Sequence, residues 1–284
     1  MKKRIKRKTG RNKISYKVYY WLTGIIVFIS LIFFFRTTLA MYYYTIKEKF
    51  EVNEHGYSDL ERSQKVSETQ KIQAVLQKYR GNAFGLDISR HQGSIVWDSV
   101  EVIKDGFPIS FVFVRATQGA FNRDAFFKKN WANLTKKNII KGAYHYYDVN
   151  RNSTAQAKNF IATVTLQKGD LPPVLDVEEL PKNQSLELLK KGILNWLQIV
   201  EDEYKIKPII YSNDAYFIHH IPDLDLSDYL IWVANYNPRE NPIHPKWSFW
   251  QFTEKGIVKG ISQNFVDINV FNGNQDKLKE LTIK

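Results

Sequence analysis

The stretch "VLDVEEL", residues 174–180, places Asp176 and Glu178 two positions apart in an apolar run that follows a Pro-Pro pair. Residues two apart on a β-strand share one face, so both carboxyl groups point to the same side and Leu175 and Val177 to the other. Ionised acids are costly to bury without partners. The stretch therefore predicts a strand with one face used for packing and the other for chemistry.

Two further predicted strands, 84–89 and 265–271, repeat this split of polar and aliphatic faces. A single acid at a strand end is more often a turn or helix cap, and Glu179, on the opposite face, is read as a surface or ion-paired acid. Four acids of matching parity are harder to explain in that way. We expect one cluster to contain Asp87, Asp176, Glu178 and Asp267.

The chain after residue 84 alternates short β-branched and aromatic runs with helix-like segments, which is typical of parallel βα units. The predicted strands are 84–89, 111–117, 139–147, 172–178, 207–212, 229–235, 248–253 and 265–271, and the predicted helices are 124–138, 153–166, 185–204 and 214–219. The last three strands lie too close together for full helices between them. We therefore predict an α/β fold, an irregular TIM-barrel-like (β/α) barrel with the acids near the carboxyl ends of its strands.

Clustered acids suit two kinds of chemistry. Like charges held together raise at least one pKa, which provides a proton donor near neutral pH, and paired carboxyl groups are the equipment of glycoside hydrolysis. A Mg²⁺ or Ca²⁺ site is the competing use. The sequence has no calcium loop, no phosphate-binding glycine loop, no HExxH or GxSxG motif and no cysteine, so we predict no metal and no cofactor. His145 is expected to be a hydrogen-bonded pocket or core residue.

Aromatic residues near predicted strand ends fit a sugar ligand, because pyranose rings offer apolar faces and hydroxyl rims. Each one alone is more often core packing, and about half are expected to touch ligand. The candidates are Tyr144, Tyr146, Trp232, Tyr236 and Trp250.

The N-terminal region predicts a membrane anchor. Nine Lys and Arg residues precede an uncharged run from Tyr19 to Phe35 that aromatic residues flank on both sides. The positive-inside rule then keeps the tip in the cytoplasm and exports the rest, to a periplasm or a wall zone. We predict a basic tip (1–18), one transmembrane helix (19–41) in contact with cytoplasmic membrane lipid, a partly helical stalk (42–81) and a domain (82–284). A cleaved signal peptide is the alternative, although residues 38–40 form a poor cleavage site.

The formal charge of +12 does not indicate a nucleic-acid partner. Without the nine basic residues of the tip, the chain carries 32 basic and 29 acidic residues, and no basic cluster stands out among them.

Eight motifs in order resemble those of glycoside hydrolase family 25, the lysozymes of the Chalaropsis and bacteriophage type. The resemblance covers about residues 82–280. The motifs are "GLDISRHQG" (85–93), "FVFVRATQG" (111–119), "GAYHYY" (142–147), "PPVLDVE" (172–178), "PIIYSN" (208–213), "IWVANY" (231–236), "WQFT" (250–253) and "VDIN" (266–269).

This resemblance implies an irregular barrel that cleaves the β-1,4 bond between N-acetylmuramic acid and N-acetylglucosamine in peptidoglycan, with retention of configuration. It implies Glu178 as the general acid/base and Asp176 as the nucleophile or as the group that steadies an intermediate formed by the substrate acetamido group. Asp87 and Asp267 are then flanking acids. The implied substrate-binding residues are Tyr144, Tyr146, Tyr211, Trp232, Tyr236 and Gln251.

Together these features predict a membrane-anchored N-acetylmuramidase that acts on peptidoglycan glycan strands and remodels the wall of its own cell. Two alternatives stay open: a chitinase-like retaining enzyme, although the longer D-x-x-D-x-D-x-E signature is absent, and a non-catalytic wall-binding barrel.

Overall fold

The computed structural model describes residues 20–21, 25, 68–103, 106–236, 241–261 and 265–284. The chain divides into two compact units, residues 1–65 and 66–284. Within the described residues, no helix has the length and apolar character needed to cross a bilayer. Apart from residues 20, 21 and 25, the predicted membrane span lies outside the described residues, as do the basic tip and the first part of the predicted stalk.

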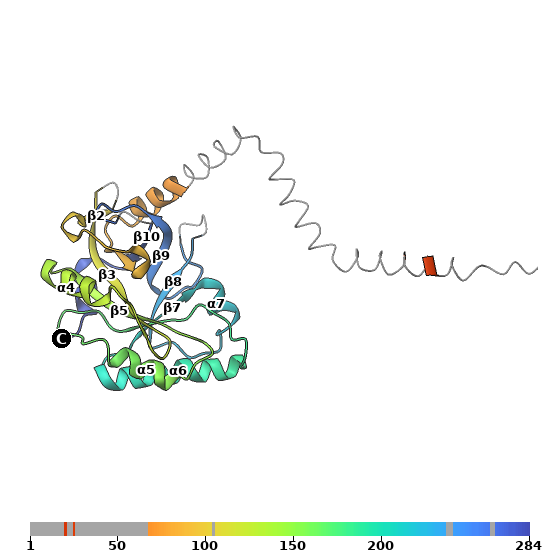
Figure 1. The fold of residues 1–284 in the computed structure, drawn as a ribbon. Helices are drawn as coiled ribbons and strands as arrows, with labels where there is room; N and C mark the ends of the chain where they lie inside the picture. Colours follow the sequence, from red (N-terminus) through yellow and green to blue (C-terminus); the bar gives the residue numbers. More distant parts are fainter. Residues whose placement is uncertain (1–19, 22–24, 26–67, 104–105, 237–240, 262–264) are drawn as a thin grey trace, which may run out of the picture. The chain divides into compact units, whose positions relative to one another are not determined.

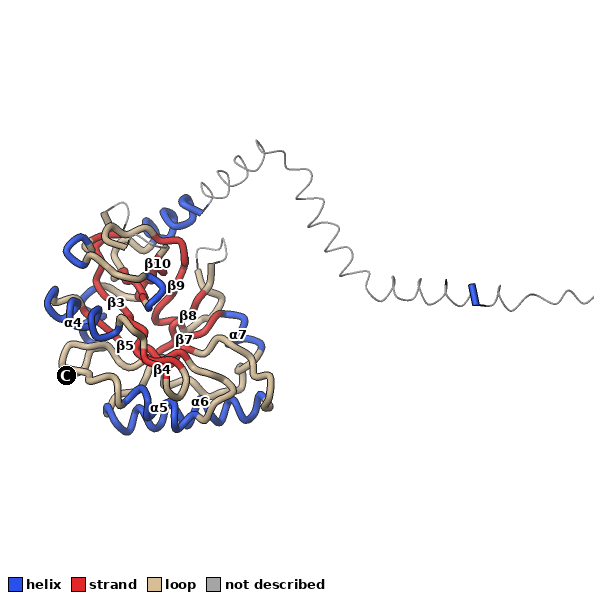
Figure 2. The backbone as a smooth tube through the Cα atoms, in the orientation of Figure 1, coloured by secondary structure: helices blue, strands red, loops and turns tan. Residues whose placement is uncertain are grey.

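Eight strands close into a barrel in the second unit, because β1 pairs with both β3 and β10 (Figure 1, Figure 2). A strand forms at each of the eight predicted positions. They are β1 (Phe84–Ile88), β3 (Phe107–Gln118), β5 (Ile140–Tyr146), β6 (Val174–Asp176), β7 (Ile209–Asn213), β8 (Leu230–Ala234), β9 (Trp247–Gly256) and β10 (Val266–Phe271). The short strands β2 (Val102–Ile103) and β4 (Asn122–Arg123) pair with β3 outside this ring.

The helices fall close to the predicted segments, and most begin at a side-chain cap. They are α4 (Phe127–Lys137), α5 (Ser153–Ile161), α6 (Leu186–Tyr204), α7 (Asp214–His219) and the unpredicted α8 (Gln275–Glu280), with 3-10 turns η1 (Arg90–Gln92) and η2 (Trp97–Ser99). Ser185, for example, accepts a hydrogen bond from the Leu188 amide at the start of α6. Helix α5 ends at Ile161, several residues before the predicted end. In Figures 1 and 2, α5 and α6 lie together along one side of the barrel.

β10 differs from the strands of a regular (β/α) barrel, which all run parallel to one another. β10 runs antiparallel to both β9 and β1, whereas the other neighbouring pairs in the ring are parallel. The beginning of β10 therefore lies at the end of the barrel where the other strands finish. Asp267 reaches the predicted cluster from the start of its strand, not from the carboxyl end, and it lies in register with Asp87.

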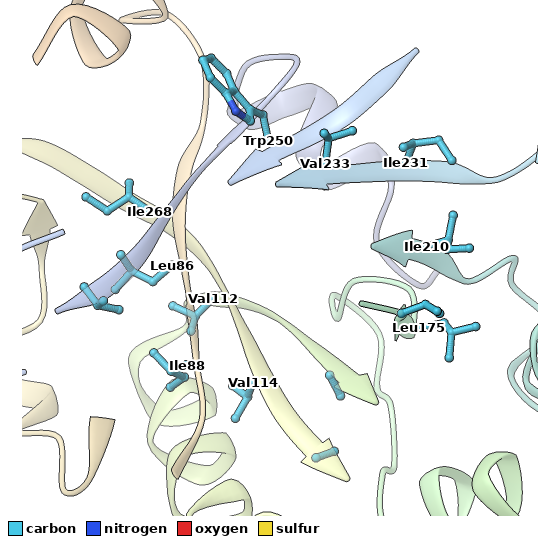
Figure 3. Packing of buried hydrophobic residues seen from close by; sticks show 14 of the residues in the cluster. Leu86, Ile88, Val112, Val114, Leu175, Ile210, Ile231, Val233, Trp250 and Ile268 are labelled. Carbon is cyan, nitrogen blue, oxygen red and sulfur yellow. The ribbon is translucent and has the colours of Figure 1, made fainter. Parts of the chain in front are cut away.

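Strand parity separates two cores. Aliphatic side chains such as Leu86, Val112 and Ile210 point outward and pack under the helices (Figure 3). Inside the barrel, Phe113 stacks on Trp232 with ring centroids 4.5 Å apart. Each such side chain removed from water contributes roughly 1.5–3 kcal/mol, so both layers hold the ring of strands together.

A helix over residues 68–78 belongs to this unit and packs on the barrel. Its Val75 and Leu76 are buried in the outer core. Tyr79 makes edge-to-face contacts with Trp247 at 5.8 Å and Trp250 at 5.9 Å between ring centroids. The second part of the predicted stalk is therefore helical and lies against the domain.

Trp250 is not a ligand-facing residue. Its side chain is 1% exposed in the outer core, and its indole N–H donates to the Asn235 carbonyl at 3.0 Å. Trp250 and Gln251 are adjacent on β9, so only one of them can face the barrel interior, and that residue is Gln251.

His145 is a buried core residue, as predicted. Its Nδ1 lies 2.7 Å from the Thr117 hydroxyl, its Nε2 lies 3.1 Å from Gln156 Oε1, and its ring stacks on Trp196. Gln156 Nε2 donates to two backbone carbonyls, which fixes Oε1 as an acceptor for His145 Nε2–H. Burial disfavours the charged ring, so the imidazole is neutral, and Nδ1 then accepts from the Thr117 hydroxyl.

This burial predicts a loss of stability in mild acid. Burial lowers the pKa of His145 to about 4, below the ordinary value of 6.5. Because the unfolded chain binds the proton more tightly, the contribution of His145 is complete above pH 6.5 and falls as pH drops toward 4. We expect the unfolding free energy to be about 2 kcal/mol lower at pH 5 than at pH 7 because of His145. Urea denaturation of the wild type and His145→Phe at both pH values measures it, and an equal pH dependence in the two proteins would contradict the assignment.

Candidate active site

A cavity of about 230 Å³ opens at the end of the barrel where the parallel strands finish. Every residue that the sequence assigned to the site by motif or parity lines it, apart from Trp250. They are Asp87, Asp176, Glu178, Asp267, Tyr144, Tyr146, Tyr211, Trp232, Tyr236 and Gln251. Three larger hollows of about 450, 540 and 410 Å³ lie elsewhere on the described surface, but the acid cluster lines none of them.

Glu178 lies beyond the strand that was predicted to carry it, because β6 ends at Asp176. The backbone nevertheless stays extended: the Val177 amide donates to the Tyr211 carbonyl at 3.0 Å, and the Ser212 hydroxyl donates to the Val177 carbonyl at 2.5 Å. These bonds preserve the alternation of side-chain directions beyond the end of β6, so Glu178 lines the cavity together with Asp176.

Asp176 is a buried acid with one unsatisfied oxygen. Its side chain is 5% exposed, and its Oδ1 is buried without a hydrogen-bond partner. Burial raises the pKa of Asp176 well above its usual range; the charges of Glu178 and Asp87 add to this, and the Arg115 guanidinium opposes it. An orphaned carboxylate oxygen that faces a cavity is available to a ligand N–H or O–H.

Glu178 lies at the exposed mouth of the cavity. Partial loss of hydration is the largest cause that raises its pKa, and the charge of Asp87 raises it further, while hydrogen bonding to Asp176 and Tyr211 acts in the opposite direction. Glu178 and Asp176 therefore behave as one acidic pair that retains a proton more readily than two isolated carboxyl groups.

The second pair of acids lies across the β1–β10 ladder. Burial, followed by the charge of Asp87, raises the pKa of Asp267 to about 9. Asp87 is 6% exposed, and its Oδ2 accepts hydrogen bonds from Gln251 Nε2 at 2.8 Å and Asn269 Nδ2 at 2.7 Å. Burial raises the pKa of Asp87, and these two amides oppose the rise.

Arg115 is a residue of the cavity that the sequence interpretation missed. It is almost fully buried, and its Nε donates to Asp124 Oδ2 at 3.1 Å, which fixes the guanidinium beside the acids. Arg115 shares its strand face with Phe111 and Phe113, so strand parity could have placed it. The other missed lining residues are Ser89, His91, Gln92 and Glu254.

The aromatic residues form mainly the floor and walls of the cavity. Tyr144, Tyr211 and Trp232 are buried and present only part of each ring to the space. Tyr236 is 40% exposed at the rim, and the Tyr146 hydroxyl donates to Glu179 at 3.0 Å. Flat rings beneath a rim of hydroxyls and carboxylates suit the apolar faces and polar edges of a sugar.

The competing use of the acid cluster is a metal site. Across the described ranges, no group of three or more His, Cys, Asp or Glu side chains is arranged to hold an ion. The acids have amide, hydroxyl and guanidinium neighbours instead, which favours acid–base chemistry.

The family model described as Glycosyl hydrolases family 25 matches residues 86–261, which is more than half of the chain and includes three of the four acids. The chain belongs to family 25 of the glycosyl hydrolases. The match runs from β1 to just beyond β9, so the family 25 enzyme and the barrel described above are the same unit.

Relatives of this family 25 enzyme include proteins with and without an assigned activity. It is 38% identical over 197 residues to the uncharacterised protein YegX of Escherichia coli K12, covering 69% of this chain and 71% of YegX. It is 32% identical over 211 residues to Lysozyme M1 of Streptomyces globisporus, covering 69% of this chain and 70% of that protein. The crystal structure of a bacterial lysozyme from Streptomyces coelicolor superposes with a TM-score of 0.64 at 29% identity, covering 71% of this chain and 97% of the other.

Proposed function

We propose that this family 25 glycosyl hydrolase is an N-acetylmuramidase that cleaves the β-1,4 bond between N-acetylmuramic acid and N-acetylglucosamine in peptidoglycan, with retention of configuration. The arrangement of Asp176 and Glu178 in one cavity carries the proposal, because burial raises the pKa of both acids and Asp176 has an oxygen without a hydrogen-bond partner. Similarity to proteins named as lysozymes supports the choice of substrate.

In the proposed reaction, Glu178 is the general acid. It gives its proton to the O4 atom of the departing N-acetylglucosamine while the bond from that oxygen to C1 of the muramic acid residue breaks. Its position at the open mouth of the cavity gives a leaving sugar room to depart, and burial raises its pKa, which favours retention of the proton.

Asp176 acts on the substrate acetamido group. Its orphaned Oδ1 accepts the acetamido N–H, and this bond favours the ionised form of Asp176. The shared proton of the acid pair then lies on Glu178, where the departing oxygen needs it. The acetamido oxygen bonds to C1 as the leaving group departs. Water then attacks C1 and gives its proton to the Glu178 carboxylate, while the bond from C1 to the acetamido oxygen breaks and restores the acetamido group. Two inversions at C1 give net retention.

Digestion of purified peptidoglycan tests this proposal. We expect mass spectrometry to find the new reducing ends on N-acetylmuramic acid, and proton NMR during the digestion to find the β-anomer formed first. Reducing ends on N-acetylglucosamine, or digestion of chitin without digestion of peptidoglycan, would favour the chitinase-like alternative. Binding to the wall without release of any fragment would favour the non-catalytic barrel.

We also propose that the enzyme is anchored in the cell membrane by residues 19–41, with residues 1–18 in the cytoplasm and the barrel outside. The uncharged run and the nine basic residues before it support this topology. Cell fractionation of the full chain should recover the intact protein with membranes and leave the barrel open to protease in spheroplasts. A shorter soluble form that begins after residue 40 would instead indicate a cleaved signal peptide.

A further inference from the structure

Two buried side-chain amides, those of Asn269 and Gln251, donate hydrogen bonds to Asp87. Asn269, on β10, is fully buried, and its Oδ1 accepts a hydrogen bond from the Trp232 indole N–H at 2.8 Å. An indole nitrogen can only donate, so the amide oxygen of Asn269 must face Trp232. The Asn269 NH2 group is thereby directed at Asp87 Oδ2, 2.7 Å away.

Gln251, on β9, is oriented in the same way by different partners. Its side chain is 3% exposed, and its Oε1 accepts from the hydroxyls of Tyr211, at 2.8 Å, and Tyr236. The Gln251 NH2 group therefore donates to Asp87 Oδ2 at 2.8 Å.

Both amides converge on one oxygen of Asp87, and this convergence disfavours a proton on that carboxyl group. An oxygen that accepts two N–H bonds has no room for its own hydrogen, and such bonds stabilise a carboxylate over the neutral acid. Asp267 lies opposite Asp87 in the ladder and lacks this pair of donors among the hydrogen bonds of the described residues. A proton shared between the two acids therefore belongs on Asp267.

We propose that Gln251 and Asn269 are positioning residues that hold Asp87 as a permanent carboxylate, with Asp267 as its neutral partner, so that the fixed charge of Asp87 keeps Glu178 protonated. Gln251 then acts through Asp87 and does not bind the sugar. The catalytic part of this inference rests on the proposed muramidase function; the assignment of charge to Asp87 and Asp267 does not.

The groups around Asp87 decide whether its carboxyl group is ionised. Burial alone would favour a neutral Asp87, and the hydrogen bonds from Asn269 and Gln251, followed by the hydrogen bond with Asp267, oppose that effect. Titratable and charged groups from the other elements also line the cavity. They are Tyr144 and Tyr146 on β5, Tyr211 on β7, Tyr236 after β8, Glu254 on β9, Asp267 on β10, Asp176 on β6, Glu178 after β6, Arg115 on β3 and His91 on η1.

The test replaces Gln251 by methionine, which keeps the length of the side chain and removes both the amide donor and the acceptor. We expect Asp87 to take up a proton more readily in Gln251→Met. Loss of the Asp87 charge lets Glu178 ionise at lower pH. The basic limb of the kcat/KM–pH profile then shifts to lower pH by about 0.5–1 pH unit, and kcat/KM at pH values above the limb falls about three- to ten-fold.

Gln156→Met is the matched control. Gln156 is a fully buried glutamine with side-chain hydrogen bonds, but it lies behind His145 between the barrel and the helices. We expect Gln156→Met to lower the melting temperature without moving the basic limb. A shift of the same size in both variants would mean that loosened packing moves the limb, and the positioning role would be rejected.

Carbon-13 NMR of the aspartate carboxyl groups in the wild-type protein provides a readout that needs neither activity nor a folded variant. We expect the Asp87 carbon to keep the chemical shift of a carboxylate from pH 5 to pH 8, and the Asp267 carbon to keep that of a neutral acid. A neutral Asp87 or an ionised Asp267 in this range would overturn the proposal. If the charges are as expected but peptidoglycan is not cleaved, the proposed function fails and the assignment of charge stands.

Discussion

Glu178→Gln is expected to lower kcat/KM on peptidoglycan by about a thousand-fold while the protein stays folded. Glutamine keeps the size of the side chain but cannot donate a proton to a departing sugar oxygen, and general acid catalysis contributes roughly 10²–10⁴-fold. Glu178 lies at the exposed mouth of the cavity, outside both cores, so its replacement removes no packing. Release of soluble fragments, measured alongside the melting temperature, separates lost chemistry from lost folding.

Glu179→Gln is the control for this result, because it makes the same change at the next residue. Glu179 does not line the cavity, and its carboxylate accepts from the Tyr146 hydroxyl at 3.0 Å. We expect less than a ten-fold effect. Equal losses in the two variants would show that the reaction depends on the summed charge of the loop and not on a proton held by Glu178.

Gly142→Ala is expected to destabilise the barrel by about 3 kcal/mol, at the upper end of the usual cost of overpacking. Gly142 lies on β5 facing the barrel interior, and an added Cβ would lie 2.5 Å from two ring carbons of Phe113 and 3.2 Å from Leu171 Cβ. Phe113 is itself fixed by its stacking on Trp232, so the ring has no free space into which it can move. Urea denaturation, followed by tryptophan fluorescence, measures the change in unfolding free energy.

Two further variants test whether the clash between the added Cβ and the Phe113 ring causes the loss of stability. Gly81→Ala adds the same methyl group where nothing lies within 4 Å, and we expect it to change the unfolding free energy by less than about 1 kcal/mol. Phe113→Leu in the background of Gly142→Ala should recover part of the loss, because the smaller side chain removes the clash. Additive effects of these two substitutions would contradict the contact between them.

Much of the site could be predicted because strand parity is a local property. Residues two apart share a face in any strand, so Asp176 with Glu178, and Asp87 apart from Leu86, follow from the sequence before any partner strand is known. The same rule, applied to β3 and β9, would have added Arg115 to the cavity and removed Trp250 from it. Those two errors came from incomplete use of a local signal and not from a lack of information.

The sequence by itself determined which side chains share a strand face and that strands alternate with helices, because both follow from the short-range geometry of the backbone. Only the tertiary structure decided that β10 runs against its neighbours and brings Asp267 into register with Asp87. It also decided that Trp232 and two tyrosines turn the amides of Asn269 and Gln251 toward one carboxylate oxygen. These contacts join residues as many as 182 positions apart, and their geometry depends on how the ring closes, which no local pattern encodes.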